Sequence, residues 1–353
     1  MTFLISGIQQ VGIGNPDTPK AFDWYRKNFG FDIPVLNENS EAAQMLPYTE
    51  GKAQKRHAIL AINLMGGGGL EIWQYTQRIP RAAEFQIHLG DFGLSIAKIR
   101  APDIHKSFDF LTKNGVKIIT PVSADPIGAP HFYCLDLFGN PFEIVQNHSI
   151  FSQTQHPMGG CFGIAIGVGD MEKAIRFYSK ILGYDQVLFE GKDSYADFEN
   201  FPGGNEILHR VILGHKEKRK GHFSELLGVS QIELIKSVNR AGKKIFENRN
   251  WGDLGFIHLC FDVWNMKELK SYCEKEGFPF TVESDANFEM GEAAGQFAYI
   301  EDPDGTLIEF VETHKIPILK KIGWYLQLKK FTPTRPLPSW MLKMMKFSRV
   351  KNP

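Results

Sequence analysis

The feature that most constrains this chain is an internal repeat that runs through nearly all of its 353 residues. Residues 20–32 align without gaps on residues 173–185, and six of the thirteen positions are identical. In the second and fourth quarters, five residues recur at a constant offset of 166: Asp136, Gly139, Glu143, Val145 and His148 recur as Asp302, Gly305, Glu309, Val311 and His314. Such self-similarity predicts four copies of one small structural unit.

Each unit is predicted to contain a strand, a helix and three further strands. In the first quarter the strands are expected at residues 5–13, 31–36, 57–65 and 70–75. Asp17 can cap the first helix, and Gly30 can end it in a left-handed conformation. Helices at 103–114 and 266–276 likewise end at a glycine, and the glycines at 66–69 indicate a hairpin turn rather than a phosphate loop.

The repeat divides the chain into residues 1–150 and 151–314, each a domain of two units, followed by an arm at 315–353. The arm holds ten Lys and Arg residues and no Asp or Glu. We expect its Trp and Pro residues to drape the arm over the body, where it packs. A membrane-surface or nucleic-acid-binding segment is the alternative that its charge allows.

The composition narrows the class of protein. With 43% hydrophobic and 23% charged residues, the chain is expected to be globular with a large core. Lys plus Arg and Asp plus Glu both number 40, which gives no reason to expect a nucleic-acid partner. The four cysteines form no CxxC pair, and neither a signal sequence nor an apolar run of ~18 residues stands out. We expect a cytoplasmic monomer or homodimer that acts on a small molecule and has no membrane span.

Several side chains in apolar strands are able to bind a metal. His258 lies in one such strand, and Glu309 follows a glycine turn in another. Strand alternation places Glu71 on the same face as Trp73 and Tyr75. An unpaired carboxylate among apolar neighbours is costly, so both glutamates require a partner. A lone histidine in a strand is more often a core residue, whereas one that converges with carboxylates can hold a divalent metal.

The four βαβββ units, each ending in a strand with an inward Glu after a Gly turn, resemble the vicinal oxygen chelate superfamily. That group includes glyoxalase I, extradiol dioxygenases and bleomycin-resistance proteins. The resemblance covers roughly residues 3–314, and its most specific part runs from Asp302 through Gly305 to Glu309. It implies an α+β fold in which four βαβββ modules form two cupped mixed-sheet halves. In that family two modules make each cup, and a divalent metal sits inside.

The resemblance also implies where ligands would lie. The positions are Gln10, Leu94, Gly163 and His258 on the first strands and Glu71, Glu143, Glu233 and Glu309 on the last strands. If the first module pairs with the fourth, one cup holds Gln10, Glu71, His258 and Glu309, a set similar to that of one glyoxalase I class. If neighbours pair instead, each cup lacks one ligand. We favour the first arrangement because it makes one whole site, and the sequence leaves the pairing open.

The glyoxalase I resemblance implies a metal-dependent isomerase or lyase. One divalent ion (Ni, Zn, Fe or Co) would chelate adjacent substrate oxygens while a ligand carboxylate moves a proton between neighbouring carbons. By the motif match Glu309 would be the base and Glu71 its counterpart across the metal. Trp73 and Tyr75 are the expected substrate-binding residues, and they favour an apolar or aromatic substrate.

Departures from the family pattern bear on the substrate. Glutathione-dependent members carry two arginines and an asparagine at positions that are Gly14, Leu254 and Tyr75 here, so glutathione is not the expected thiol. An extradiol-type dioxygenase is one alternative, but it needs two His and one carboxylate around iron, and Gly163 occupies one of those positions. A metal-free binding protein of the bleomycin-resistance type is the other alternative.

Overall fold

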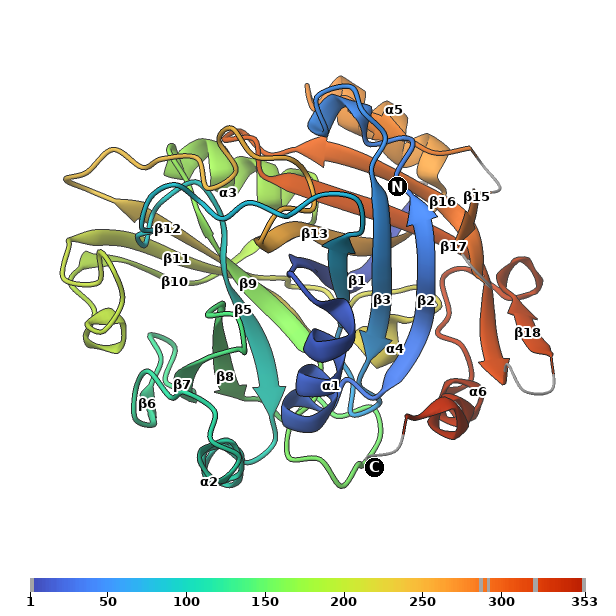
Figure 1. Cartoon of the computed structure of the whole chain (residues 1–353), viewed down its shortest axis with the longest axis horizontal. Coiled ribbons are helices and arrows are strands. Elements are labelled where there is room, and N and C mark those ends of the chain that lie inside the picture. Colours follow the sequence, from blue (N-terminus) through green and yellow to red (C-terminus); the bar gives the residue numbers. More distant parts are fainter. Residues whose placement is uncertain (1–2, 286–287, 291–292, 320–322, 351–353) are drawn as a thin grey trace.

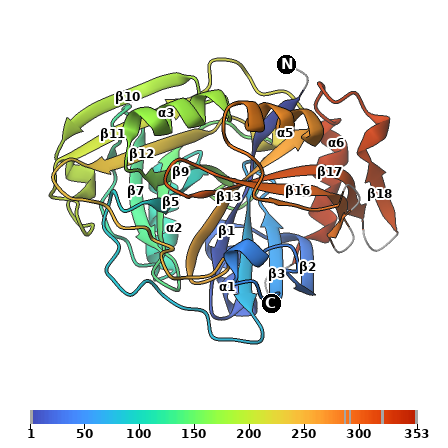
Figure 2. The ribbon, with the colours of Figure 1, turned by 90° about the horizontal axis from the view of Figure 1, so that it is seen from above.

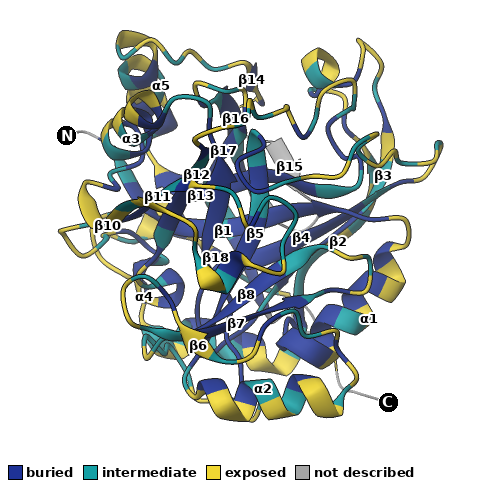
Figure 3. Cartoon of the chain, turned by 90° about the vertical axis from the view of Figure 1, so that its left-hand side faces the viewer, coloured by how far each residue is buried: buried dark blue, intermediate teal, exposed yellow. Residues whose placement is uncertain are grey.

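The computed structural model describes residues 3–285, 288–290, 293–319 and 323–350. Over these residues the chain forms two curved, mixed β-sheets that meet near the middle of the molecule, with few helices (Figure 1). The strands of both sheets are mostly buried, whereas α2 turns an exposed side to solvent (Figure 3). The predicted α+β fold with two cupped mixed sheets is confirmed.

The first two units follow the predicted order of strand, helix and three strands. The first contains β1 (Leu4–Gly14), α1 (Thr18–Phe29), β2 (Ile33–Glu41), the short 3-10 turn η1 (Leu46–Tyr48), β3 (Lys55–Ile62) and β4 (Gly69–Tyr75). The second contains β5 (Gly93–Ala101), α2 (Ile104–Lys113), β6 (Ser123–Ala124), β7 (Pro130–Leu135) and β8 (Pro141–Gln146).

The third and fourth units repeat this order with short additions. The third contains β9 (Cys161–Gly167), α3 (Met171–Lys180), β10 (Gln186–Asp193), η2 (Ala196–Phe198), β11 (Leu208–Gly214), α4 (Ser224–Leu227) and β12 (Gln231–Ser237). The fourth contains β13 (Gly255–Trp264), α5 (Met266–Lys275), β14 (Val282–Glu283), β15 (Phe288–Met290), β16 (Ala293–Glu301) and β17 (Leu307–Leu319). After it come β18 (Trp324–Gln327), η4 (Leu328–Lys330), α6 (Ser339–Lys343) and η5 (Met344–Ser348).

The units that share a sheet are not neighbours in sequence. The first sheet, which forms the first cup, runs β14-β16-β17-β13-β1-β4-β3-β2. It joins the fourth unit to the first through the antiparallel pair β1 and β13. The second sheet, which forms the second cup, runs β10-β11-β12-β9-β5-β8-β7-β6. It joins the third unit to the second through β5 and β9. Figure 2 shows β1 beside β13 although the two strands come from opposite ends of the chain. The favoured first-with-fourth pairing is therefore correct.

The helix ends follow from local sequence. The Asp17 side chain accepts a hydrogen bond from the Lys20 N–H, and Asp103 and Asp170 cap α2 and α3 in the same way. Gly30 ends α1 at φ 74, a left-handed value that a glycine adopts without steric cost. The predicted starts and stops of α1, α2 and α5 are confirmed to within a residue or two.

Neighbouring units interlock through a tyrosine and an aspartate that both belong to the sequence repeat. The hydroxyl of Tyr25 on α1 donates to Asp136 at 2.5 Å, and that of Tyr178 on α3 donates to Asp302 at 2.9 Å. Each aspartate also accepts backbone N–H groups of its own turn. Units that lie in different sheets are thus joined by buried hydrogen bonds to a carboxylate.

The C-terminal residues lie against the body. Leu326, Leu337 and Leu342 are buried in a cluster that also contains Ile33 of β2 and Leu226 of α4. In the part of the chain that the structure describes, no helix combines the length and apolar composition needed to cross a membrane.

The buried tyrosine–aspartate contacts predict a stability effect. Tyr178→Phe removes a hydrogen bond to a buried carboxylate, so we expect the free energy of unfolding in urea to fall by about 1.5–3 kcal/mol. Tyr272→Phe is the matched control because the Tyr272 hydroxyl donates to the Lys180 carbonyl at an exposed position. Its effect should stay within ~0.5 kcal/mol. Equal unfolding curves for both variants would contradict the role given to the contact.

Candidate metal centre

Four polar side chains from four neighbouring strands converge inside the first sheet. Gln10 lies on β1, Glu71 on β4, His258 on β13 and Glu309 on β17, and these strands stand side by side in the order β4-β1-β13-β17. All four side chains are buried. One ligand atom each from Glu71, His258 and Glu309 lies within 4.8 Å of the others. Residues far apart in sequence meet because β1 pairs with β13.

The contacts converge on one oxygen of each carboxylate. His258 Nε2 lies 3.2 Å from Glu71 Oε2 and 3.1 Å from Glu309 Oε2. The Gln10 side-chain amide nitrogen donates to the same two oxygens at 3.3 and 3.4 Å. The imidazole and the amide thus face two carboxylates that point at one another across a small gap.

The backbone opposite His258 makes room for its ring. Gly12 is the cross-strand partner of His258, and a Cβ at Gly12 would lie 2.4 Å from His258 Cε1. Trp251 stacks on the imidazole with ring centroids 6.2 Å apart, and Tyr299 meets it edge-on at 5.6 Å. The ring is therefore held in one orientation, with Nε2 toward the carboxylates.

The charges in the cluster support one another. Burial would lower the pKa of His258, but the Glu309 and Glu71 carboxylates outweigh burial and raise this pKa to about 9. Burial would raise the pKa of Glu71, but His258 and the Arg56 guanidinium hold it below its usual value. Arg56 donates to Glu71 Oε1 at 3.2 Å. Glu71 therefore keeps its charge in this buried site with the help of His258 and Arg56.

The residues present fit a divalent cation. A cation bound here would find two carboxylates, an imidazole nitrogen and an amide, which are ligands that Zn, Ni, Fe and Co accept. The buried Gln10 Oε1 has no hydrogen-bond partner among the described residues, and it is the amide atom that binds metals. The proton on His258 would leave, because a metal requires neutral imidazole.

A cavity of about 160 Å³ opens beside the cluster. One part of the cavity wall is polar and is formed by Gln10, Glu71 and Glu309. Trp251 and Tyr299 line the cavity beside them. The remaining wall consists mainly of aliphatic and aromatic side chains from the first unit, the α4 segment, the fourth unit and the C-terminal arm.

The predicted substrate-binding residues lie behind this wall. Trp73 is completely buried and packs edge-on against Trp251 with centroids 4.9 Å apart. The Tyr75 hydroxyl donates to the Trp251 carbonyl. Trp251 lines the cavity, whereas Trp73 and Tyr75 are not among the described lining residues, so these two can act on a ligand only through Trp251. Sequence reasoning missed Trp251 because it lies in the coil between the third and fourth units, outside the strand pattern.

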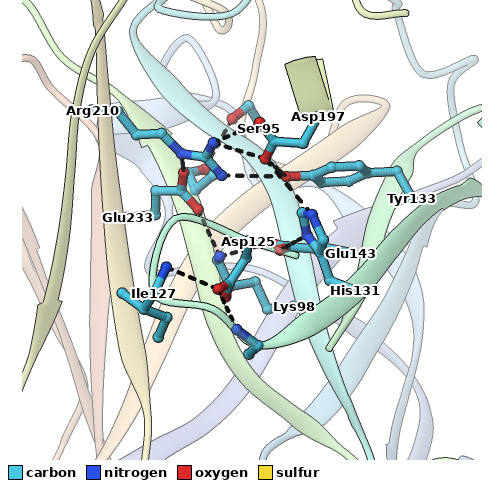
Figure 4. A network of polar contacts seen from close by, with 12 residues as sticks. Ser95, Lys98, Asp125, Ile127, His131, Tyr133, Glu143, Asp197, Arg210 and Glu233 are labelled. Atoms are coloured by element: carbon cyan, nitrogen blue, oxygen red, sulfur yellow. Dashed lines mark hydrogen bonds and ion pairs between the residues drawn. The ribbon is translucent and has the colours of Figure 1, made fainter. Parts of the chain in front are cut away.

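The second sheet holds the repeat-related pair of carboxylates, and a lysine lies between them. Lys98 Nζ is 2.6 Å from Glu143 Oε2 and 2.6 Å from Glu233 Oε2, and all three side chains are about 1% exposed (Figure 4). Burial would lower the pKa of Lys98, but the two carboxylates raise it above its usual value. The ammonium group thus occupies the point between the glutamates that a cation would take.

Further groups complete this network. Arg210 forms ion pairs with Glu233 and Asp197, and His131 Nδ1 lies 2.6 Å from Glu143 Oε1 (Figure 4). Burial alone would raise the pKa values of Glu143 and Glu233, but Lys98 and its neighbours hold both below the usual value. Glu143, Glu233 and Asp197 therefore each have a cationic or imidazole partner of the chain's own.

The two cups differ reciprocally at one cross-strand pair. In the first sheet Gly12 on β1 lies opposite His258 on β13. In the second sheet Lys98 on β5 lies opposite Gly163 on β9, so the glycine and the larger side chain have exchanged places. A Cβ at Gly163 would lie 3.1 Å from Lys98 Cδ. The lysine stem therefore uses the space that the missing histidine leaves.

One predicted position in the second cup is wrong. Glu71 pairs with Gly12 and Glu143 pairs with Lys98, so the residue two places earlier, equivalent to Gln10, is Ile96 rather than Leu94. The strand is irregular between Leu94 and Ile96, and a slip of two residues keeps every side chain on its face. The facing pattern in the sequence could not detect the slip.

The chain is similar to known proteins in sequence and in fold. The model of the family described as Glyoxalase/Bleomycin resistance protein/Dioxygenase superfamily matches residues 7–144 and 162–310. A curated relative, lactoylglutathione lyase of Schizosaccharomyces pombe, is 27% identical over 151 residues, which are 41% of this chain and 45% of that protein. The chain thus matches less than half the length of this relative.

Solved structures are similar in fold. Glyoxalase I from Zea mays has 15% identity and a TM-score of 0.53, with 87% of this chain and 92% of that chain covered. A putative dioxygenase from Bacillus subtilis has 14% identity and a TM-score of 0.55, with 88% and 86% covered. At such identities the likeness extends to the fold alone.

The second cup yields a stability prediction. Lys98→Met leaves Glu143 and Glu233 facing each other without their shared cation, so we expect the free energy of unfolding to fall by about 3–5 kcal/mol. Lys236→Met on the same sheet is the control, because Lys236 is only partly buried and its loss should cost no more than ~0.5 kcal/mol. Urea unfolding followed by circular dichroism measures both, and a Lys98→Met protein as stable as wild type would refute the assignment.

Proposed function

Since the chain belongs to the Glyoxalase/Bleomycin resistance protein/Dioxygenase superfamily, we propose that it is a metal-dependent isomerase or lyase of the glyoxalase type. It moves a proton on a small substrate that carries two adjacent oxygen atoms. The observation that carries the proposal is the convergence of Gln10, Glu71, His258 and Glu309 at the polar part of an otherwise apolar cavity.

Gln10, Glu71, His258 and Glu309 would hold one divalent ion, of nickel, zinc, iron or cobalt. When bound, the ion supplies a Lewis acid that polarises the oxygens of the substrate. Lys98 already neutralises the carboxylates of the other cup, so we expect a single ion per chain.

Glu309 is the better candidate for the base. Glu71 is tied to Arg56 through Oε1, and taking up a proton there would weaken a buried ion pair. Glu309 contacts His258 and Gln10 of the cluster, and the neutral Tyr299 hydroxyl and Cys260 thiol also hydrogen-bond to it. Glu309 can therefore turn toward a substrate carbon and accept its proton, while Glu71 stays ionised and balances the positive charge.

We do not propose glutathione, the thiol in the name of the S. pombe relative, as part of this chain's substrate. A side chain at Gly14 would collide with the Asp253 carbonyl, since a Cβ there would lie 2.0 Å from that oxygen. Leu254 and Tyr75 bring no charge to the positions that hold glutathione in glutathione-dependent enzymes. The proposed substrate is therefore an oxygenated molecule without the two carboxylates of glutathione.

Neither alternative is favoured by a specific observation. Extradiol dioxygenases bind iron through two histidines and one carboxylate, whereas the cluster here combines one histidine with two carboxylates. His209 cannot serve as the second histidine, because it lies on β11 of the other sheet and contacts Glu190. If metal analysis finds no bound ion, the chain is a metal-free binding protein.

Metal content tests the site directly. After dialysis against Ni²⁺, Zn²⁺, Co²⁺ or anaerobic Fe²⁺, elemental analysis should find one ion per chain. His258→Ala and Glu309→Gln should lower that content to near zero, because each removes a ligand. His314→Ala, on the same strand as Glu309 but outside the cluster, is the control and should retain the ion. A wild-type protein that takes up none of the four metals is a binding protein rather than this enzyme.

The type of reaction can be tested with an α-hydroxyketone in D₂O. Metal-loaded protein should exchange the proton on the hydroxyl-bearing carbon, at a rate at least ~100-fold above that of free metal, as followed by proton NMR. His258→Ala should abolish the exchange, and the rate should be equal with and without air. Oxygen uptake in proportion to substrate lost, without exchange, would instead indicate a dioxygenase.

A further inference from the structure

The cavity extends well beyond the four polar side chains, along strand β17. Glu309, Val311, Thr313 and Ile316 of this strand all line it. The seven residue-to-residue steps of extended chain from Glu309 to Ile316 correspond to roughly 23 Å. On the opposite wall Leu60 and Ile62 of β3 follow the same direction, since Leu60 pairs with Glu71. The cavity is therefore elongated, with the carboxylates toward one end.

The far end is closed by the C-terminal arm. Leu342 of α6 and Met345 of η5 line the cavity and are 1% and 5% exposed. They come after residue 310, where the family match ends. The arm is fastened to the body by hydrogen bonds from the Leu337 N–H to the His222 carbonyl and from the Val350 N–H to the Asp32 carbonyl, each 2.9 Å long. The arm thus forms a fixed wall that belongs to this chain rather than to the family unit.

The charged groups of the lining do not suit an anionic tail. Apart from Glu71 and Glu309, the charged residues among the described lining are Glu41 and Arg56. Arg56 is engaged on three sides, by Glu71 and Glu38 at 3.2 Å each and by Ser40 at 3.1 Å. A carboxylate or phosphate in the tail would have to break these pairs, whereas a hydrocarbon meets side chains of its own polarity.

We propose that the substrate has a hydrocarbon tail, and that the C-terminal arm sets the length of tail accepted through Leu342 and Met345. The oxygenated head lies at Gln10, Glu71, His258 and Glu309, and the tail runs along β17 to the arm. This inference rests on the proposed metal site. Leu342 and Met345 are specificity-determining residues, distant from the reacting atoms.

Straight-chain alkylhydroxamic acids of two to ten carbons are suitable probes, because their head presents two adjacent oxygens to a metal. Their dissociation constants are measured by calorimetry on the full-length, zinc-loaded protein. Each buried methylene should tighten binding about fourfold. The gain should stop at the chain length that reaches the arm. Acetohydroxamic acid, which has almost no tail, reports on the metal site alone.

Variants of the arm separate its contribution. Leu342→Gln and Met345→Gln should weaken the longer probes by about tenfold and leave acetohydroxamic acid unchanged, since a buried amide lacks partners there. Trp340→Gln on the same helix is the control, because Trp340 is 56% exposed and does not line the cavity among the described residues. Leu342→Phe fills space instead and should shorten the longest chain accepted, which gives a second test if the polar variants misfold.

The outcomes distinguish the two proposals. If acetohydroxamic acid binds but lengthening the chain brings no gain, or if the arm variants leave the chain-length dependence unchanged, the tail proposal is wrong and the metal site stands. If the protein binds neither zinc nor acetohydroxamic acid, the proposed function itself fails.

Discussion

Each cup of this fold buries two carboxylates that face each other, and both sheets depend on what neutralises them. Unpaired buried carboxylates are too costly to keep, so each pair needs a cation within reach. In the second cup Lys98 supplies it permanently. In the first cup the chain provides His258 and a neutral amide, a set that can share its carboxylates with a metal ion. The same repeated glutamates therefore serve a structural purpose in one cup and a proposed chemical purpose in the other.

A single cross-strand pair makes the difference. Gly12 opposite His258 leaves room for an imidazole that reaches the glutamates, while Lys98 opposite Gly163 fills the equivalent space with an ammonium group. The antiparallel pairing of β1 with β13 is what brings Gln10 and Glu71 to His258 and Glu309. If neighbouring units had paired, each cup would lack one of the four ligands.

Much of the fold could be predicted because residues close together in sequence determine where the helices begin and end. An aspartate such as Asp17 caps the start of a helix, and a glycine such as Gly30 ends it. Because the units repeat, the same residue types can be recognised in more than one unit, as Asp170 shows for α3. The cluster of Gln10, Glu71, His258 and Glu309 could be predicted as a set of neighbours from strand alternation and the family resemblance. Lys98 could not, because a lysine in a strand usually points to solvent, and only the three-dimensional pairing reveals the two carboxylates around it. Trp251 and the arm residues Leu342 and Met345 lie outside the repeat, so no pattern pointed to them.

The central claim is that one cup binds a metal and a lysine closes the other. Anomalous diffraction from crystals grown with Zn²⁺ or Co²⁺ tests it most directly. The account predicts one strong peak at about 2.0–2.1 Å from His258 Nε2, within ligand distance of Glu71 and Glu309, and no peak between Glu143 and Glu233. A peak in place of the Lys98 ammonium, or a metal-loaded crystal with no peak at His258, would contradict it.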